Sequence, residues 1–166
     1  MATITLKGNE FQTVGNLPEV GSKMKDFSLV AGDLSKKTLA DFSGSKIIFN
    51  IFPSIDTGTC AASVRAFNKT ASELDNTKVL CISRDLPFAQ GRFCGAEGIE
   101  NVVMLSDFNS GNFGQSNGLT FANGPLEGLN SRSIIVTDES GAILYTEQVA
   151  ETIDEPNYEK ALNALK

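Results

Sequence analysis

Apolar residues alternate with polar ones, or run almost without interruption, over several short segments of the chain. The segment "TITLKGNEFQTVG" has two alternating runs around Gly8 and Asn9, which predicts an N-terminal β-hairpin. "KIIFNIF", at 46–52, is apolar at nearly every position and lies between Gly44 and Pro53, so it predicts a central strand buried on both faces. Residues 27–35 predict a short strand that leads into a turn, and further strands are predicted at 78–85 and 101–107.

Helical periodicity appears in three places. Apolar positions from Cys60 to Leu74 repeat at spacings of four, three, four and three, which predicts a helix over 60–75. Residues 86–98 have helical character, and residues 155–166 predict a closing amphipathic helix with Pro156 near its first turn. The segment 37–46 reads as a helical turn or an irregular connection, and 108–130 as a Gly- and Asn-rich loop with one short helix.

The order of these elements predicts the fold class. Residues 131–150 predict two strands around the turn Glu139-Ser140-Gly141, so the last two strands form an antiparallel hairpin. Buried strands separated by helices indicate an α/β sheet flanked by helices. A length of 166 residues suits one domain with a sizeable core, so we expect a single domain over 1–166.

Charge limits the possible partners. The chain has 14 Lys and Arg against 20 Asp and Glu, a net charge of −6, and no block of basic residues. Nucleic acid and anionic membranes are therefore poor partners. The first fifteen residues lack the pattern of a signal peptide, and no apolar run approaches the roughly 18 residues of a membrane span. We expect a cytoplasmic protein.

The chain has three cysteines and no histidine. Without imidazole it cannot form a Cys–His dyad, a His-ligated haem or a mixed zinc site. A metal site made of the three cysteines would have no C-x-x-C pair, so we expect no metal and no other cofactor. Each cysteine is then either a packing residue or a reactive thiol.

Cys60 stands where a predicted strand gives way to a predicted helix. If Thr57 is the N-cap, Cys60 is the third helical residue, and the free N–H groups and the helix dipole favour its thiolate. The Thr57 hydroxyl can turn back towards the sulfur. Pro53 ends the strand and can cover the sulfur from water. The alternative is that Cys60 is a core residue, because it shares a stripe with Val64 and Phe67.

The pattern Pro53-x-x-x-Thr57-x-x-Cys60 resembles the active-site motif of the peroxiredoxins. "NIFPSIDTGTC" and "VLCISRDLPFAQGRFCGAEG" are similar to the thiol peroxidase branch of that family, and the similarity continues through "EGLNSRSIIVTD" to "DEPNYEKAL". The chain departs from the pattern at Gly58-Thr59, where we expect a bulkier apolar residue, and this affects only the shape of the pocket. The resemblance implies a thioredoxin-like fold with a central mixed sheet, and a homodimer.

The resemblance also implies an atypical two-cysteine peroxidase acting on hydrogen peroxide and especially on alkyl hydroperoxides. Cys60 would be the peroxidatic cysteine, which attacks the peroxide and becomes a sulfenic acid. Thr57 and Arg132 match the residues that stabilise charge on the peroxide oxygens. Cys94 matches the resolving cysteine, which forms an intramolecular disulfide with Cys60, and thioredoxin is the implied reductant. Without the resemblance, Arg132 could equally form a surface ion pair at a strand edge.

The other cysteines have independent sequence contexts. Gly91, Gly95 and Gly98 surround Cys94, and a glycine inside a helix costs roughly 1 kcal/mol relative to alanine, so this helix can open locally. Cys94 could otherwise be a partly buried helix residue. Cys81 lies within the apolar run "VLCIS", which favours an inert packing thiol.

Some residues near these motifs have less specific interpretations. Asp56 is expected to be a turn or cap residue and Glu97 a solvated one. Several phenylalanines are expected in the core, and some of them at an apolar entrance near Cys60: Phe52, Phe88, Phe93, Phe113 and Phe121. Two rival functions remain: a thiol–disulfide oxidoreductase, which the missing C-x-x-C disfavours, and a redox sensor without turnover.

Overall fold

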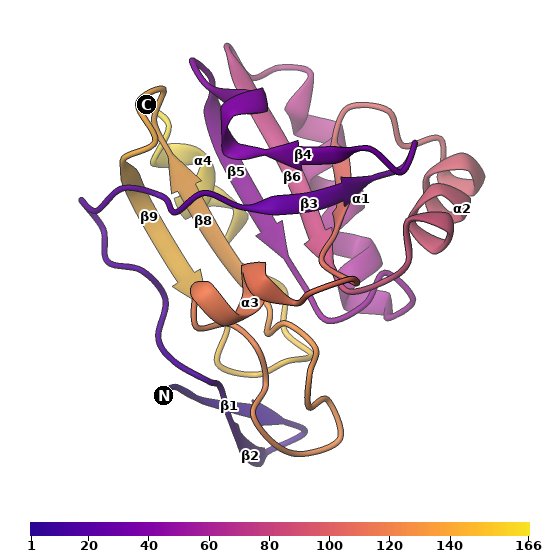
Figure 1. Cartoon of the computed structure of the whole chain (residues 1–166), viewed down its shortest axis with the longest axis vertical. Helices are drawn as coiled ribbons and strands as arrows, with labels where there is room; N and C mark the ends of the chain where they lie inside the picture. Colours follow the sequence, from indigo (N-terminus) through magenta and orange to yellow (C-terminus); the bar gives the residue numbers. More distant parts are fainter.

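A seven-stranded mixed sheet forms the centre of the computed structural model, which describes residues 1–166 (Figure 1). The strands of this sheet are β3 (Ser28–Ala31), β4 (Lys36–Thr38), β5 (Lys46–Ile51), β6 (Thr77–Ser83), β7 (Val103–Ser106), β8 (Ser133–Thr137) and β9 (Ile143–Gln148). A separate two-stranded sheet is made of β1 (Thr3–Leu6) and β2 (Asn9–Gln12). The helices are η1, a 3-10 helix (Leu39–Phe42), α1 (Gly58–Ala71), α2 (Pro87–Glu97), α3 (Asn112–Ser116) and α4 (Tyr158–Asn163).

The strand order is β4-β3-β7-β6-β5-β8-β9. β5, β6 and β7 run parallel to one another, while β8 pairs antiparallel with β5, and β9 antiparallel with β8. The predicted antiparallel hairpin at the end of the chain is therefore confirmed. The parallel pair β5 and β6 needs a crossover connection, and α1 provides it.

Helices cover the two faces of the sheet unequally. Among the helices, α1 contributes most of the apolar residues that pack on one face of the sheet. Phe93 of α2 and Ala161 of α4 pack on the same face. The other face is covered by η1, α3 and the segment before β3, where Phe27, Phe49 and Phe113 pack ring against ring. Strands buried on both faces explain why the β5 and β6 sequences are almost continuously apolar.

The segment 27–46 contains one strand that the sequence did not predict. The short strand and turn expected over 27–35 are present as β3 and the turn after it, and the helical turn expected within 37–46 is η1, but the edge strand β4 precedes it. The Asp41 carboxylate accepts a hydrogen bond from the Thr38 backbone N–H at 2.8 Å, which caps η1 directly after β4. A three-residue edge strand carries too short an alternation to be recognised in the sequence.

Smaller differences occur at element ends. α1 ends at Ala71 and not at residue 75. From the Thr70 carbonyl onwards, the backbone hydrogen bonds join residues three positions apart and no longer four, so the chain leaves the α-helix. The turn between β1 and β2 is made by Lys7 and Gly8, one residue earlier than predicted, with φ of 52° and 80°. None of the helices combines the length and the apolar character needed to cross a bilayer.

Candidate active site

Cys60 lies in the first turn of α1, the helix that follows β5 along the chain. The Thr57 hydroxyl oxygen accepts a hydrogen bond from the Cys60 backbone N–H at 3.2 Å, so Thr57 is the N-cap, as its spacing from the cysteine predicts. The Cys60 side chain has no exposed surface. The sulfur is therefore shielded from water and lies at the positive end of a 14-residue helix.

Arg132, immediately before β8, reaches the same sulfur from the neighbouring strand. Its Nη2 lies 3.4 Å from Cys60 Sγ, and its Nε and Nη2 donate to the Thr152 carbonyl oxygen at 3.2 and 2.9 Å. The side chain is 2% exposed, so the interpretation of Arg132 as part of a surface ion pair is wrong.

The charge of Arg132 has no carboxylate partner. The two ion pairs of the structure join other arginines, and Arg132 Nη1 is buried without a hydrogen-bond acceptor. A buried guanidinium is costly unless an anion compensates it. The Cys60 sulfur is the group in contact that can become an anion, and the N–H groups of Nη1 are available to a bound oxygen.

A cavity of about 370 Å³ adjoins these residues, a volume suited to a small organic molecule. Three residues of the predicted site line one side of it: Pro53, Thr57 and Arg132. Thr57 and Arg132 supply the polar groups on this side. Its apolar side is made of Leu6, Leu126, Leu129 and Ile153. Pro53 is itself buried, and its covering of the sulfur stays a prediction.

The expectation that phenylalanines line the entrance is wrong. Phe52, Phe93, Phe113 and Phe121 are buried in the core, and Phe88 is exposed on α2. The cavity wall comes instead from aliphatic residues of three loop or hairpin segments, at residue 6, at 126–129 and at 152–153. Leu126, Leu129 and Ile153 lie outside the strands and helices, so sequence periodicity does not reveal them.

The unusual pair Gly58-Thr59 shapes the cavity in two ways. A Cβ atom at Gly58 would meet no atom within 4 Å, so the glycine leaves open space beside the cysteine. The Thr59 hydroxyl donates to the Ile153 carbonyl oxygen at 2.9 Å. The first turn of α1 is thereby joined to the segment whose Thr152 carbonyl holds Arg132.

Asp85 is a site residue that sequence reasoning missed. Its carboxylate accepts hydrogen bonds from Ser54 Oγ at 2.8 Å and from the Ile55 backbone N–H at 2.7 Å. These bonds hold the loop between Pro53 and Thr57. Asp85 follows β6, which is the parallel neighbour of β5, so the two loops leave the sheet at the same edge. The expected adjacency of these two loops was the signal that could have identified Asp85 from the sequence.

The two other cysteines are both free thiols, and their surroundings differ. Cys81 is fully buried on β6, where burial raises the pKa of its thiol to about 12, in keeping with an inert packing residue. Cys94 is half-buried on α2, and burial raises the pKa of its thiol as well.

Two exposed ion pairs fasten α2 to the site. Arg92 of α2 pairs with Asp56 at 2.9 Å, and Glu97 of α2 pairs with Arg65 of α1 at 2.8 Å. Asp56 lies in the turn before α1 and Glu97 is exposed to solvent, as expected, and each of them also forms an ion pair. Exposed pairs of this kind contribute at most about 1 kcal/mol each, so they add little to the packing that holds α2 in place.

The fold and this cysteine–arginine arrangement define a thioredoxin-like peroxiredoxin. A sequence profile described as Redoxin matches residues 19–162, and the chain belongs to this family, in its thiol peroxidase branch. A curated relative, the thiol peroxidase of Corynebacterium glutamicum, is 53% identical over 165 residues, which cover 99% of each chain. These relatives identify the chain as a peroxidase oxidoreductase.

Solved structures show the same fold. The peroxiredoxin-like protein from Aquifex aeolicus superimposes with a TM-score of 0.92 at 32% identity, covering 98% of this chain and 95% of the other. A thiol peroxidase from Chromobacterium violaceum superimposes with a TM-score of 0.90 at 21% identity, covering 97% and 93% of the two chains.

Proposed function

We propose that this thiol peroxidase reduces hydroperoxides at Cys60, within one domain that spans the chain, and that Cys94 resolves the oxidised cysteine. The observation that carries the proposal is the contact of Arg132 Nη2 with Cys60 Sγ, 3.4 Å apart, at the N-terminus of α1. A buried cation without a carboxylate partner makes this sulfur a nucleophile in the absence of any histidine.

In the first step the Cys60 thiolate attacks the terminal oxygen of the hydroperoxide. A sulfur–oxygen bond forms, the O–O bond breaks, and the departing alkoxide takes up a proton and leaves as an alcohol, or as water when the substrate is hydrogen peroxide. Cys60 is left as a sulfenic acid. Arg132 Nη1 and the Thr57 hydroxyl proton are the donors available to stabilise charge on the two oxygens.

In the second step the Cys94 thiol displaces the sulfenic oxygen as water and forms a disulfide with Cys60. The buried position of Cys60 and the half-buried position of Cys94 indicate that α2 opens first. Opening also exposes the Cys94 thiol to water, which reverses the burial that raises its pKa. Movement and activation of the resolving cysteine therefore occur together.

Stiffening α2 is expected to slow this second step alone. A Cβ atom at Gly91 or Gly95 would meet no neighbour within 4 Å, so Gly91→Ala and Gly95→Ala fit without strain. Each change favours the closed helix by about 1 kcal/mol, which is about a fivefold slower disulfide formation. Rapid quenching and intact mass measure sulfenic acid and disulfide separately. An unchanged rate of disulfide formation would show that α2 does not open.

The direct test of the two-cysteine cycle is the Cys94→Ser variant. It should consume one equivalent of an organic hydroperoxide at the normal rate and then stop when a dithiol protein is the only reductant. Pre-reduced wild-type protein, given one equivalent, should instead lose two hydrogens and yield a Cys60–Cys94 peptide. Full turnover by Cys94→Ser would remove Cys94 from the mechanism.

Thioredoxin is the proposed reductant, because a disulfide is reduced by exchange with a protein dithiol. The reductant attacks one sulfur, and its second thiol completes the exchange, so both cysteines of this chain return as thiols. The chain has no C-x-x-C pair, which continues to disfavour a thiol–disulfide oxidoreductase. Sustained turnover with excess peroxide distinguishes the enzyme from a redox sensor.

Alkyl hydroperoxides are the proposed preferred substrates. The apolar wall of the cavity, formed by Leu6, Leu126, Leu129 and Ile153, offers contact to an alkyl chain that hydrogen peroxide lacks. The comparison to make is the rate constant of the first step for an organic hydroperoxide and for hydrogen peroxide. Equal constants would contradict this preference.

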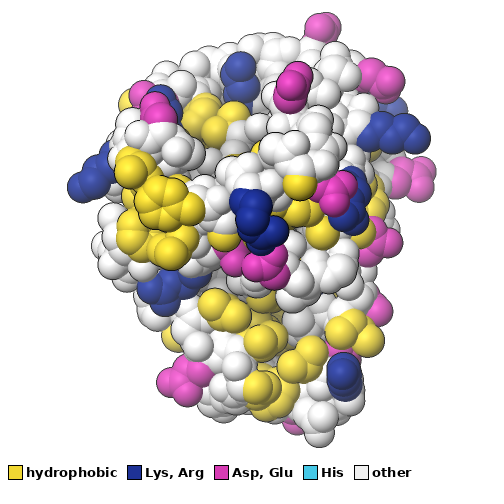
Figure 2. All heavy atoms as spheres, turned by 90° about the vertical axis from the view of Figure 1, so that its right-hand side faces the viewer, with side chains coloured by type: hydrophobic (Ala, Val, Ile, Leu, Met, Phe, Trp, Pro, Cys, Tyr) yellow, Lys and Arg dark blue, Asp and Glu magenta, His cyan; other side chains and the backbone are white.

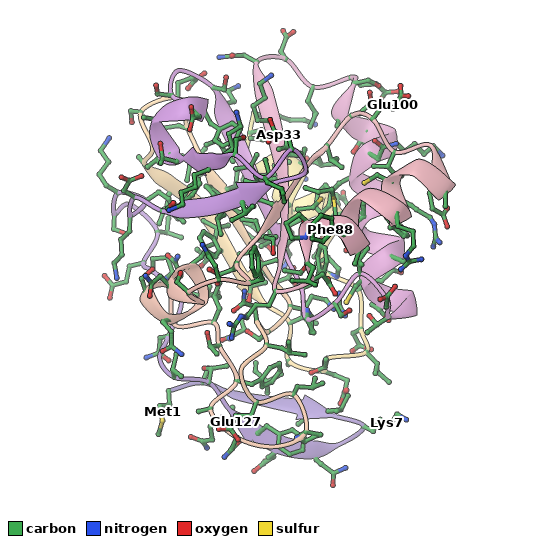
Figure 3. All side chains as sticks on the ribbon, turned by 45° about the vertical axis from the view of Figure 1, so that its right-hand side comes forward. Met1, Lys7, Asp33, Phe88, Glu100 and Glu127 are labelled. Carbon is green, nitrogen blue, oxygen red and sulfur yellow. The ribbon has the colours of Figure 1, made fainter.

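A homodimer is proposed as well. Leu86, Phe88 and Phe108 are exposed by 50, 69 and 36%, and hydrogen bonds from Arg84 to Phe108 and from Ser106 to Asp85 hold their segments together. Apolar side chains gather on this face (Figure 2), and Phe88 projects from the start of α2 (Figure 3). Such a group suits a protein interface, and sedimentation equilibrium would detect the resulting dimer.

The cytoplasmic location stays a prediction.

A further inference from the structure

The structure assigns Glu151, which lies outside the cavity, as a positioning residue for Arg132. This inference rests on the proposed function, because it concerns the guanidinium that serves the peroxide reaction. Glu151 follows β9 and forms a parallel bridge with Thr5 of β1. The β1–β2 hairpin is a unit separate from the main sheet (Figure 1). Glu151 does not line the cavity and has no bond to Cys60, but its carboxylate accepts a hydrogen bond at 3.4 Å from the backbone N–H of Ile153, a residue of the cavity wall.

The carboxylate of Glu151 binds the tip of the hairpin. It accepts hydrogen bonds from Thr5 Oγ1 at 2.7 Å, from the Lys7 backbone N–H at 2.9 Å and from the Gly8 backbone N–H at 3.1 Å. The positive φ angles of Lys7 and Gly8 turn both N–H groups towards one point, and Lys7 stands at the hairpin tip in Figure 3. Two adjacent N–H groups in this arrangement suit an anion and not an amide.

The hairpin in turn fixes the segment that follows Glu151. The Thr5 backbone N–H donates to the Ala150 carbonyl oxygen at 2.8 Å, and the Thr5 carbonyl oxygen accepts from both the backbone N–H and the hydroxyl of Thr152, each at 2.8 Å. Thr152 is thus held on its N–H and hydroxyl sides by β1. Its remaining polar atom, the carbonyl oxygen, points to Arg132.

That carbonyl is the acceptor that orients the guanidinium. It accepts from Nε at 3.2 Å and from Nη2 at 2.9 Å, and the same Nη2 contacts Cys60 Sγ. A chain of direct bonds therefore runs from the Glu151 carboxylate through the hairpin and Thr152 to the guanidinium. Because a buried arginine without a carboxylate is oriented by its carbonyl acceptor, movement of Thr152 moves the donors that face the peroxide.

The charge of Glu151 is secure at neutral pH. Its hydrogen bonds, first that from Thr5, lower the pKa of the carboxyl group to about 2. A carboxylate with a lowered pKa stabilises the fold above its ordinary value of 4.5, and this contribution is lost as the pH falls towards 2. At neutral pH the Glu151 carboxylate is therefore ionised, and the hairpin stays bound to it.

The test compares Glu151→Gln with a matched control, Asp138→Asn. Asp138 also receives backbone and hydroxyl hydrogen bonds within a turn, from Ser140 and Ala142, but it lies at the far end of β8 from Arg132. Because the chain has no Trp, the first step is followed by rapid quenching and intact mass. The second readout is the pH at which Cys60 is half-reactive towards iodoacetamide.

We expect Glu151→Gln to slow the first step about tenfold or more, since small displacements of a positioned group can cost up to about a hundredfold. The alkylation midpoint of Cys60 should move to higher pH, because its cation is less well placed. Glu151→Asp, which keeps the charge, should restore part of both. Asp138→Asn should change neither.

Equal rates and midpoints for Glu151→Gln and Asp138→Asn would overturn the role of Glu151. If Glu151→Gln does not fold, Thr5→Val removes the 2.7 Å bond to the carboxylate, together with the longer 3.2 Å contact of the same hydroxyl with the Ala150 carbonyl oxygen, and should show a smaller loss in the same direction. An unchanged first step in folded Thr5→Val would then overturn the inference. Failure of wild-type protein to consume peroxide would instead contradict the proposed function.

Discussion

A Cys60→Ser variant is expected to consume no hydroperoxide. Serine is nearly isosteric with cysteine, so it fits the fully buried position at the start of α1. Its hydroxyl does not ionise near neutral pH, whereas the thiolate is the nucleophile of this chemistry. The contact with Arg132 stays in place and has no anion to stabilise. Peroxide remaining in solution after mixing with reduced protein measures the effect.

The control for this variant is Cys81→Ala. Cys81 is equally buried, and burial raises the pKa of its thiol to about 12, so it contributes packing without reactivity. Loss of its sulfur should lower the free energy of unfolding by about 1 kcal/mol or more and leave the first step unchanged. An active Cys60→Ser protein, or an inactive folded Cys81→Ala protein, would contradict the assignment of the nucleophile.

An Arg132→Met variant is expected to react with peroxide about a hundredfold to a thousandfold more slowly, the usual cost of losing one such charge-stabilising donor. Two effects combine, because the thiolate loses its cation and the peroxide oxygens lose the unpaired Nη1 donor. The protein should still fold. Arg132 has no carboxylate partner, so its removal leaves no buried carboxylate without a cation. Methionine fills the space left by the aliphatic part of the arginine side chain.

Arg84→Met provides the control for charge removal. The Arg84 guanidinium also donates to backbone carbonyls, at Gly128 and Phe108, but has no bond to Cys60. Its first-step rate should stay within a few-fold of wild type, with an unchanged Cys60 alkylation midpoint. A folded Arg132→Met protein that reacts at the wild-type rate would remove Arg132 from the reaction.

The sequence was informative where chemistry depends on neighbours along the chain. The distance from Thr57 to Cys60 is set by helix geometry, so the N-cap and the dipole around the sulfur followed from spacing alone. Apolar runs likewise identified β5 and β6, because strands buried on both faces leave an uninterrupted pattern. Arg132 was found differently, through a family resemblance, since nothing local distinguishes it from a surface arginine.

Residues that act across the fold left no local pattern. Asp85, Glu151 and Thr152 serve the site through hydrogen bonds to residues that lie 20 or more positions away along the chain. The aliphatic cavity wall belongs to the same class, and the expectation of phenylalanines there failed because ring-to-ring packing keeps several of them in the core.

By itself, the sequence determined an α/β protein with one cysteine at a helix N-terminus, because periodicity and capping are properties of consecutive residues. The tertiary structure decided which cation meets that sulfur, what lines the cavity and how the guanidinium is held. Those outcomes depend on pairs such as Cys60 and Arg132, 72 positions apart, which are brought together by the pairing of β5 with β8. Strand order is a property of the whole fold, and no single stretch of sequence contains it.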